Sequence, residues 1–405
     1  MTKPLESELY DVAVIGGGIH GVGVAQAAAA AGHSVALFEQ KELAYGTSSK
    51  SSKLIHGGLR YLESYEFSLV RESLRERELL IKNAPELVRR QDFYIPVYDT
   101  TQRPAWMMRA GLILYSVLAG LGKTVRFESV ARNHWENLDG ISTKGLKKVF
   151  RYTDGQTDDR ILTRAVMQSA QSFGAELACP AEVTRIEIKD AGCDIEYTHQ
   201  ESNHSVRAHT IVNAAGPWAN RILKTVTPSQ PLMPVDLVQG THLELPGKIE
   251  QGCYYIEMPK DKRAVFVIPW KGRTMLGTTE HAYEGDPGQV SVLPEEVDYL
   301  LEGYQQHFPD RDTEVIKSWA GLRVLPSAKG AAFKRSRETQ LPVDNKQRPR
   351  FLSIFGGKLT GYRATAVKVL KTLKPMLPSA TAVADTAEVK LTPVEGDSLD
   401  VDSTD

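Results

Sequence analysis

Short apolar runs and one long alanine-rich segment alternate near the start of the chain. Residues 10–15 and 34–38 are apolar runs of strand length, and they predict buried strands. Residues 19–31 between them favour a helix, and Gly32 follows where glycine commonly ends one. A strand, a helix and a second strand in this order predict a βαβ unit and a parallel sheet.

Two later segments have the periodicity of amphipathic helices. Residues 65–83 place apolar and charged side chains on different faces, and Pro85 marks the end of the predicted helix. Residues 159–173 form the second one, in which Asp158 can cap the start and Gly174 the end.

Short strands dominate the middle of the chain. A three-stranded meander is predicted at residues 182–188, 193–198 and 205–213. Further strands are predicted at residues 235–238, 242–245, 254–258, 265–269 and 274–277. We expect these later strands to form an antiparallel sheet in a second domain inserted into the first.

Composition excludes several classes of protein. The chain has 405 residues, 41% of them hydrophobic, which favours two domains. With 49 basic and 50 acidic residues, it lacks the basic surplus of a nucleic-acid-binding protein. Its three cysteines show no metal-ligand spacing, so we expect no metal site and reduced thiols in the cytoplasm.

The most apolar segment, residues 105–122, carries Arg109 and is shorter than the roughly 20 apolar residues that span a bilayer. A buried helix is the more frequent interpretation of such a segment. Docking on the inner face of a membrane through Trp106, Met107, Leu112 and Leu114 is the alternative.

A glycine motif supplies the first candidate chemistry. Gly16, Gly18 and Gly21 follow a predicted strand and open a helix, where they allow a tight turn, a close approach of pyrophosphate and close packing of the helix. Glu39 ends the second strand, where a carboxylate can accept hydrogen bonds from a ribose. The motif in this context predicts dinucleotide binding and leaves FAD and NAD open.

Longer segments resemble the FAD-dependent glycerol-3-phosphate dehydrogenases, which belong to the D-amino-acid-oxidase-like flavoproteins. The segments are DVAVIGGGIHG at 11–21, TSSKSSKLIHGGLRYLE at 47–63, VNAAGPW at 212–218, AGLRV at 320–324 and FGGKLTGYR at 355–363. His20 departs from the family's asparagine, and VLPSAKG follows Arg323 in place of the usual continuation. The chain also ends where typical members continue into a helical C-terminal domain.

The resemblance implies an α/β fold with a Rossmann-type FAD-binding domain and an inserted, mainly antiparallel β-sheet substrate domain. We expect residues 1–95, 155–230 and 320–385 in the first domain, residues 96–154 and 231–319 in the second, and an acidic disordered tail at 386–405. The implied reaction oxidises sn-glycerol 3-phosphate to dihydroxyacetone phosphate, with hydride passing from C2 to flavin N5. Quinone is the expected electron acceptor, oxygen is its alternative, and a homodimer is compatible with this assignment.

The candidate catalytic residues lie in these matching segments, except His242, which starts a predicted strand of the inserted domain. Arg60 and Arg323 present paired donors suited to phosphate oxygens, and Tyr61 can donate a hydrogen bond to the substrate. His56 and His242 are rival general bases, since imidazole titrates near neutral pH.

The glycine turn before the last helix can face the flavin, where Lys358 and the helix N-terminus would stabilise negative charge. The residues expected to bind FAD are Gly16, Gly18, Ile19, His20, Gly21, Glu39, Thr47, Ser48, Ser49, Lys53, Leu54, His56, Val183, Gly216, Gly357, Lys358, Leu359 and Thr360.

Two other functions stay open at this point. The two arginines could bind a carboxylate, as a flavin oxidase of an amino acid or a 2-hydroxy acid would require. A flavin-binding regulator without catalytic activity is the third hypothesis.

Overall fold

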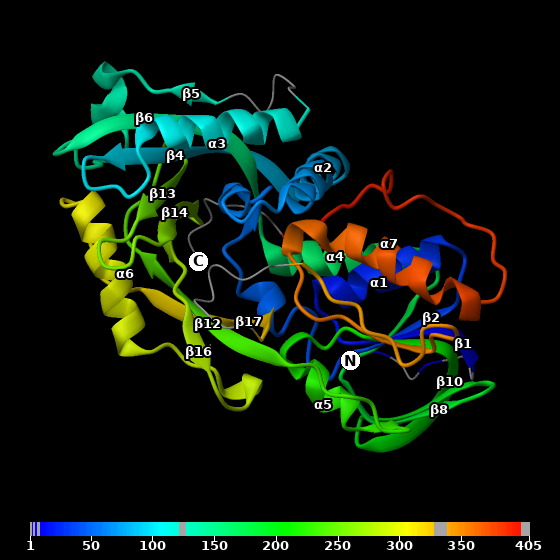
Figure 1. The fold of residues 1–405 in the computed structure, drawn as a ribbon. Coiled ribbons are helices and arrows are strands. Elements are labelled where there is room, and N and C mark those ends of the chain that lie inside the picture. Colours follow the sequence, from blue (N-terminus) through cyan, green and yellow to red (C-terminus); the bar gives the residue numbers. More distant parts are fainter. Residues whose placement is uncertain (1, 3–4, 6–8, 121–126, 328–337, 398–405) are drawn as a thin grey trace.

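The computed structural model describes the chain except residues 1, 3–4, 6–8, 121–126, 328–337 and 398–405. Its described residues form two β-sheets with helices around them (Figure 1). The end of the predicted helix segment at 105–122, the last three residues of the VLPSAKG segment and the end of the predicted tail lie outside the described residues.

The first sheet begins with the predicted βαβ unit, which is confirmed. β1 (Leu9–Ile15) pairs in parallel with β2 (Val35–Phe38) and with β10 (Ser202–Asn213). β7 (Glu176–Ala178) extends the sheet beyond β2, and β18 (Phe351–Ser353) pairs in parallel with β10. The predicted meander is β8 (Ala181–Lys189), β9 (Gly192–His199) and β10, with β11 (Val226–Thr227) beside β8.

Three helices pack together beside this sheet (Figure 1): α1 (Ile19–Ala30), α4 (Asp159–Ser172) and α7 (Tyr362–Leu373). The Asp158 carboxylate accepts from the backbone N–H groups of Arg160 and Ile161, so the predicted N-cap of α4 is confirmed. A Cβ on Gly23 would meet the Tyr362 ring at 2.6 Å, so this glycine lets α7 approach α1 closely.

The second sheet has the order β16–β12–β15–β14–β13–β4–β6–β3, with β17 beside β12 and β5 beside β6. Its strands are β3 (Leu54–Ile55), β4 (Val88–Tyr98), β5 (Glu128–Ser129), β6 (Leu146–Thr157), β12 (Val235–Leu245), β13 (Cys253–Glu257), β14 (Ala264–Trp270), β15 (Arg273–Gly277), β16 (His281–Tyr283) and β17 (Lys317–Pro326). Most of its pairs are antiparallel, and β13 with β4 is parallel.

The sheet differs from the expected strands and boundaries in two respects. Residues 235–238 and 242–245, expected as separate strands, are the ends of the single strand β12, because the polar residues between them pair with β17 without a break. β3, the first part of β4 and most of β17 belong to the second sheet, although we expected residues 1–95 and 320–385 in the first domain.

Helices cover the second sheet and join the two parts (Figure 1). α2 (Phe67–Asn83) and α3 (Ala105–Leu118) pack on one apolar cluster with β4 and β6, whereas α6 (Pro294–His307) packs on another. The short helix α5 (Ala219–Leu223) follows β10. No helix among the described residues is both long enough and apolar enough to cross a membrane.

Residues 386–397 of the expected tail are packed against the first domain. Leu391 is buried in its core, and its N–H donates to the Asn83 carbonyl at 2.8 Å. Asp397 pairs with Arg164 of α4 at 2.7 Å. Disorder was expected from the acidic composition of this segment, and composition alone does not show that Leu391 packs into the core.

Candidate functional site

A cavity of about 650 Å³ lies between the two sheets. Most of the residues that line it come from within 15–20, 38–61, 181–184, 214–225, 240–242, 263–266, 278–280, 321–326 and 356–360, and the others are Tyr152, Asp159, Tyr255 and Glu338. A pocket of this size is ordinary for a small molecule or cofactor. The predicted site residues on its wall are Gly16, Gly18, Ile19, His20, Glu39, Thr47, Ser48, Leu54, His56, Arg60, Tyr61, Val183, Gly216, His242, Arg323, Gly357, Lys358, Leu359 and Thr360.

The glycine turn has the geometry of a phosphate cradle. Gly16 has a φ of +110°, and a Cβ there would meet the Ala214 carbonyl oxygen at 2.7 Å. Gly21 does not line the cavity; a Cβ on it would overlap the Gly16 carbonyl, so it serves the packing of α1. Gly18 faces the cavity, where only Ser48 Oγ would lie within 4 Å of an added Cβ, at 3.1 Å.

Glu39 lies on the cavity wall at the end of β2. Its two carboxylate oxygens accept from the Gly17 N–H at 2.7 Å and from the Lys41 N–H at 2.8 Å. Burial raises the pKa of Glu39, although these two hydrogen bonds favour its charged form. The carboxylate is thus fixed in place and keeps lone pairs for a further donor.

The loop after β2 brings hydroxyl groups to the start of α1. Ser48 Oγ accepts from the Ile19 N–H at 2.9 Å, and Thr47 Oγ1 donates to the Leu322 carbonyl at 2.6 Å. Ser49 and Lys53 do not line the cavity. Ser49 Oγ donates to the Gly46 carbonyl at 3.3 Å.

Lys53 anchors this loop from behind. Its ammonium forms a buried ion pair with Asp159 at the start of α4 and donates to the Ser49 carbonyl at 2.8 Å. Sequence reasoning grouped Lys53 with the residues that would contact the cofactor because the segment is polar throughout. The partner that engages it, Asp159, lies 106 positions away.

His242 is buried and His56 is half-buried, and the pKa of each lies well below its ordinary value. Burial, with help from the charges of Lys358, Arg60 and Arg77, lowers the pKa of His56 to about 3. Burial, followed by the charges of Arg323 and Lys53, lowers the pKa of His242 to about 3.

The two histidines differ in their partners. His242 Nε2 and Ser52 Oγ share a hydrogen bond of 2.9 Å, and the ring stacks on Trp319 with centroids 5.5 Å apart. The His56 backbone N–H donates to Thr360 Oγ1 at 3.1 Å, and its ring contacts Phe266. Each ring is neutral, and its lowered pKa makes it a weak base in this state, so neither geometry nor pKa separates the two candidates.

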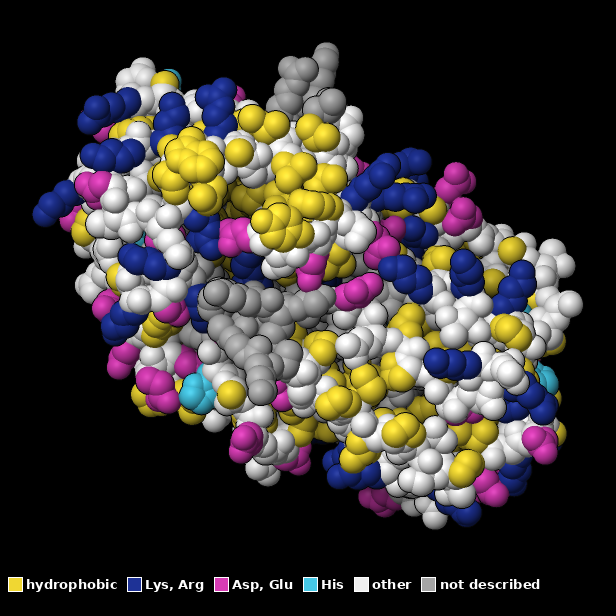
Figure 2. All heavy atoms as spheres, viewed as in Figure 1, with side chains coloured by type: hydrophobic (Ala, Val, Ile, Leu, Met, Phe, Trp, Pro, Cys, Tyr) yellow, Lys and Arg dark blue, Asp and Glu magenta, His cyan; other side chains and the backbone are white. Residues whose placement is uncertain are grey.

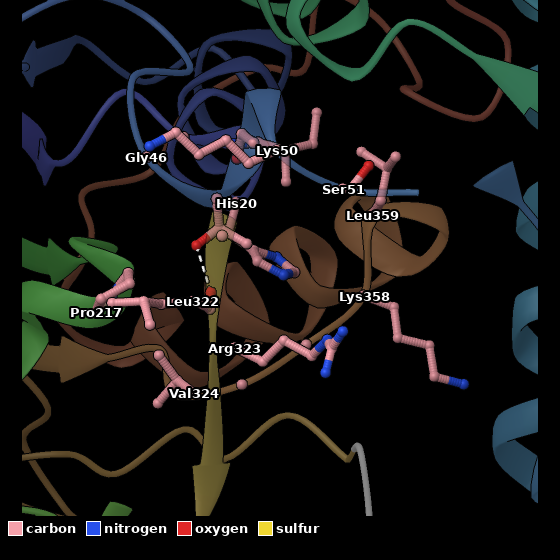
Figure 3. A pocket seen from close by; sticks show the side chains of 18 of the residues that line it. His20, Gly46, Lys50, Ser51, Pro217, Leu322, Arg323, Val324, Lys358 and Leu359 are labelled. Carbon is pink, nitrogen blue, oxygen red and sulfur yellow. Dashed lines mark hydrogen bonds between the residues drawn. The ribbon is translucent and has the colours of Figure 1, made fainter. Parts of the chain in front are cut away.

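Positive side chains gather at one end of the cavity. Figure 3 shows Arg323 of β17 and Lys358 in the cavity, and the neutral ring of His20 of α1 lies beside them. The Lys358 ammonium lies 3.6 Å from the centre of the Tyr61 ring, and the Arg60 guanidinium carbon lies 5.6 Å from it. These cations therefore share one aromatic neighbour.

Two charged residues of this wall were missed by sequence reasoning. Glu280 pairs with Arg323 at 3.5 Å and with Arg263 at 3.7 Å, and all three side chains line the cavity. Arg323 also donates to Thr278 Oγ1 at 3.0 Å. Neither Arg263 nor Glu280 lies in a distinctive motif, and their pairing with Arg323 depends on strand register, so no local signal marked them.

The cavity suits FAD on two observations. His20 is half-buried beside Gly357, both of its ring nitrogens are shielded from solvent, and neither has a hydrogen-bond partner among the described residues. Burial lowers the pKa of His20 to about 4, so it offers one neutral donor and one acceptor to a bound group. Gly16 and Gly357, with φ of +110° and +96°, carry no side chain, so a bound group can approach the backbone near His20.

Comparison with known proteins agrees with this fit. Residues 11–361 match the model of a family described as FAD-dependent oxidoreductase. A glycerol-3-phosphate dehydrogenase of Pseudomonas aeruginosa is 41% identical over 91% of this chain and 72% of its own length. A D-erythritol 1-phosphate dehydrogenase of Brucella abortus is 36% identical over 92% of this chain and 75% of its own length.

A solved structure has the same architecture. The glycerol-3-phosphate dehydrogenase of Bacillus halodurans, complexed with FAD, superposes with a TM-score of 0.72 and is 25% identical. The match covers 95% of this chain and 68% of that one.

Proposed function

Because this chain belongs to the FAD-dependent oxidoreductase family, we propose that it oxidises sn-glycerol 3-phosphate to dihydroxyacetone phosphate. The observation that carries the proposal is the cationic end of the cavity, where Arg60, Arg263, Arg323 and Lys358 lie with Glu280. A phosphate monoester carries nearly two negative charges at neutral pH, and guanidinium groups match its oxygens in pairs. A monoanionic carboxylate would use less of this positive charge.

The chain's own residues would perform three tasks. Arg323 and Arg60 hold the phosphate and hydroxyl oxygens, and Glu280 keeps the Arg323 and Arg263 side chains in place. A neutral imidazole, His56 or His242, accepts the proton of the substrate's secondary alcohol. FAD, when bound, supplies the hydride acceptor. Lys358, which lines the same cavity, would stabilise the negative charge that reduction adds.

A longer polyol phosphate is the second substrate to test. The relative named D-erythritol 1-phosphate dehydrogenase is nearly as similar to this chain as the one named glycerol-3-phosphate dehydrogenase. Both names describe phosphorylated polyols, so the phosphate clamp supports either substrate equally. Discrimination between glycerol 3-phosphate and D-erythritol 1-phosphate would depend on the space in the cavity for the hydroxyl groups farthest from the phosphate.

A single assay tests the proposal. The FAD-loaded protein is mixed without oxygen with glycerol 3-phosphate, D-erythritol 1-phosphate, glycine, proline or 2-hydroxyglutarate, and the flavin absorbance is followed. We expect bleaching by glycerol 3-phosphate. Bleaching by D-erythritol 1-phosphate alone would move the substrate to the longer polyol, and bleaching by an amino or hydroxy acid alone would favour a different oxidase. If the absorbance of the oxidised flavin persists with all five compounds, the result would favour a flavin-binding regulator without catalytic activity.

We also propose that the protein contacts a membrane surface and passes its electrons to quinone. The support for membrane contact is the outer face of α3, where Trp106 is 70% exposed and Met107, Ile113 and Val117 are also exposed. Figure 2 shows hydrophobic side chains gathered on the surface at α3. Of the four residues expected from the sequence to dock, Trp106 and Met107 lie on this face, whereas Leu112 is buried.

A further inference from the structure

A buried tyrosine of α3 is joined to the turn that carries His56. The Gly57 N–H donates to the Tyr115 hydroxyl oxygen at 2.8 Å, and that hydroxyl donates to Asp154 Oδ2 at 2.8 Å. Tyr115 is 1% exposed and does not line the cavity. It thus contacts the turn from outside the cavity in which substrate would bind.

The turn is shaped to receive this hydroxyl. A Cβ on Gly57 would lie 2.5 Å from the Tyr115 oxygen and 2.6 Å from a methyl group of Leu74. Any side chain at this position would therefore displace the tyrosine or the turn. Gly58, the next residue, has a φ of +82°, and a Cβ there would overlap the Tyr61 ring.

Charged groups behind Tyr115 fix the direction of its hydroxyl. Asp154 forms a buried ion pair with Arg77, whose guanidinium also donates to the Thr153 carbonyl at 3.3 Å. Burial and the charge of Asp154 raise the pKa of Tyr115 well above its ordinary value, so the hydroxyl stays protonated. With its proton directed to Asp154, its oxygen lone pairs face Gly57.

The other side of the turn is held by the loop that precedes α7. The His56 N–H donates to Thr360 Oγ1 at 3.1 Å, and the Thr360 hydroxyl donates back to the His56 carbonyl at 3.3 Å. Two consecutive amides are thus bound by hydroxyl groups from two different segments of the chain. Arg60 follows within the same turn, in the 3-10 helix Leu59–Leu62.

We propose that the Tyr115 hydroxyl is a positioning group for the reaction, which holds the 56–58 turn, and with it His56 and Arg60, in the geometry that substrate oxidation needs. The inference rests on the proposed function, since it assigns Tyr115 to that same site. Loss of the hydroxyl leaves the buried Gly57 N–H without its acceptor, and the turn then moves to satisfy it. Movement of His56 and Arg60 away from their reactive positions slows the chemical step more than it weakens substrate binding.

The test compares Tyr115→Phe with Tyr254→Phe in the FAD-loaded enzyme. Tyr254 is a matched control, because its buried hydroxyl also donates to a carboxylate, Asp139, at 2.7 Å, and it does not line the cavity. Phenylalanine keeps the ring in each case, and the Tm of both variants shows whether the fold is retained. Hydrogen exchange of residues 54–61 is measured without substrate, and the limiting rate of anaerobic flavin reduction is measured with glycerol 3-phosphate.

We expect exchange in residues 54–61 to be about tenfold faster in Tyr115→Phe, and flavin reduction at saturating substrate to be at least about tenfold slower. FAD affinity should stay unchanged, and Tyr254→Phe should match the unmodified enzyme in both measurements. Unchanged exchange and rate in Tyr115→Phe, or equal losses in Tyr254→Phe, would overturn the inference. If glycerol 3-phosphate does not reduce the unmodified enzyme, the proposed function fails, and the exchange measurement alone decides on Tyr115.

Discussion

At the scale of single residues, the guanidinium of Arg323 is the most informative one to remove. It reaches the cavity from β17, and it shares Glu280 with Arg263. We predict that Arg323→Ala lowers kcat/KM for glycerol 3-phosphate by about a hundredfold or more, mainly through KM, because a charged hydrogen-bond partner of the phosphate is lost. Steady-state kinetics at several substrate concentrations measure this, and a parallel FAD titration should show unchanged cofactor affinity.

Arg273→Ala is the matched control for this substitution. Arg273 also pairs with a glutamate of the second sheet, Glu244, at 2.6 Å, but it does not line the cavity. Its removal should leave KM within about twofold of the unmodified value, because this partly buried pair lies outside the cavity and contacts no substrate. A similar rise of KM in both variants would show that general loosening of the sheet, rather than contact with phosphate, explains the first result.

His20 gives a prediction about stability and pH. Its folded pKa of about 4 lies below the ordinary value of 6.5, so the unfolded chain takes up its proton first as the pH falls. The folded state therefore loses stability below about pH 6.5, with a slope of up to about 1.4 kcal/mol per pH unit for this group. Between about pH 7.5 and about pH 5, His20 alone should reduce the free energy of unfolding of the FAD-free protein by about 2 kcal/mol.

His20→Asn isolates this contribution, because asparagine keeps a polar side chain that does not titrate. Denaturant unfolding at the two pH values should give the variant a smaller loss of stability than the unmodified protein, by about the amount stated above. The same pH dependence in both proteins would mean that His20 is not buried in its neutral form.

At the scale of secondary-structure elements, α3 has two faces with different tasks. Met108, Leu112 and Tyr115 are buried, whereas Trp106, Met107, Ile113 and Val117 face outward. We predict that the protein co-floats with lipid vesicles and that Trp106→Ser combined with Ile113→Ser abolishes this, because exposed apolar area is lost.

The control for α3 is a polar substitution on a helix of the first domain. Val367→Ser removes a side chain that is 45% exposed on α7 and leaves α3 intact. This variant should float as the unmodified protein does. Equal flotation of the double α3 variant, or no flotation of the unmodified protein, would remove α3 as the contact surface.

The elements also show how far sequence patterns reach. The βαβ unit, the meander and α4 with its cap were predictable because their signals are local: apolar runs, a glycine turn and an N-cap aspartate. The pairing of β17 with β12, about eighty positions earlier in the chain, was not predicted, because strand pairing depends on contacts between distant segments. A linear pattern carries no information about such a partner.

The residues of the candidate site fall into two groups, those marked by local motifs and those that depend on distant contacts. Gly16, Glu39, Arg323 and Lys358 were found through motifs, and each lines the cavity. Arg263, Glu280 and Tyr115 were missed, since each matters only through partners that folding brings near. Lys53 lies in a motif and was expected to bind FAD, but it does not line the cavity and instead holds the loop in place by pairing with Asp159.

At the scale of the whole molecule, the cavity joins the two sheets, since residues of both line it. FAD bound there would contact both parts and stabilise them together. With FAD about a hundredfold above its Kd, the linkage relation gives about 2.7 kcal/mol of added stability. For a chain of 405 residues we predict a Tm rise of roughly 3 °C in a single unfolding transition.

Gly18→Ala provides a version of the protein in which this linkage is broken and the fold is kept. Gly18 has φ and ψ of −78° and 173°, which alanine adopts freely, and its new Cβ would press only on the Ser48 hydroxyl. The methyl group would occupy the side from which pyrophosphate approaches the backbone, so calorimetry of the FAD-free variant should resemble that of the unmodified chain, and added FAD should have little effect. Two separate transitions in the unmodified protein, of which only one responds to FAD, would contradict a cofactor that bridges the sheets.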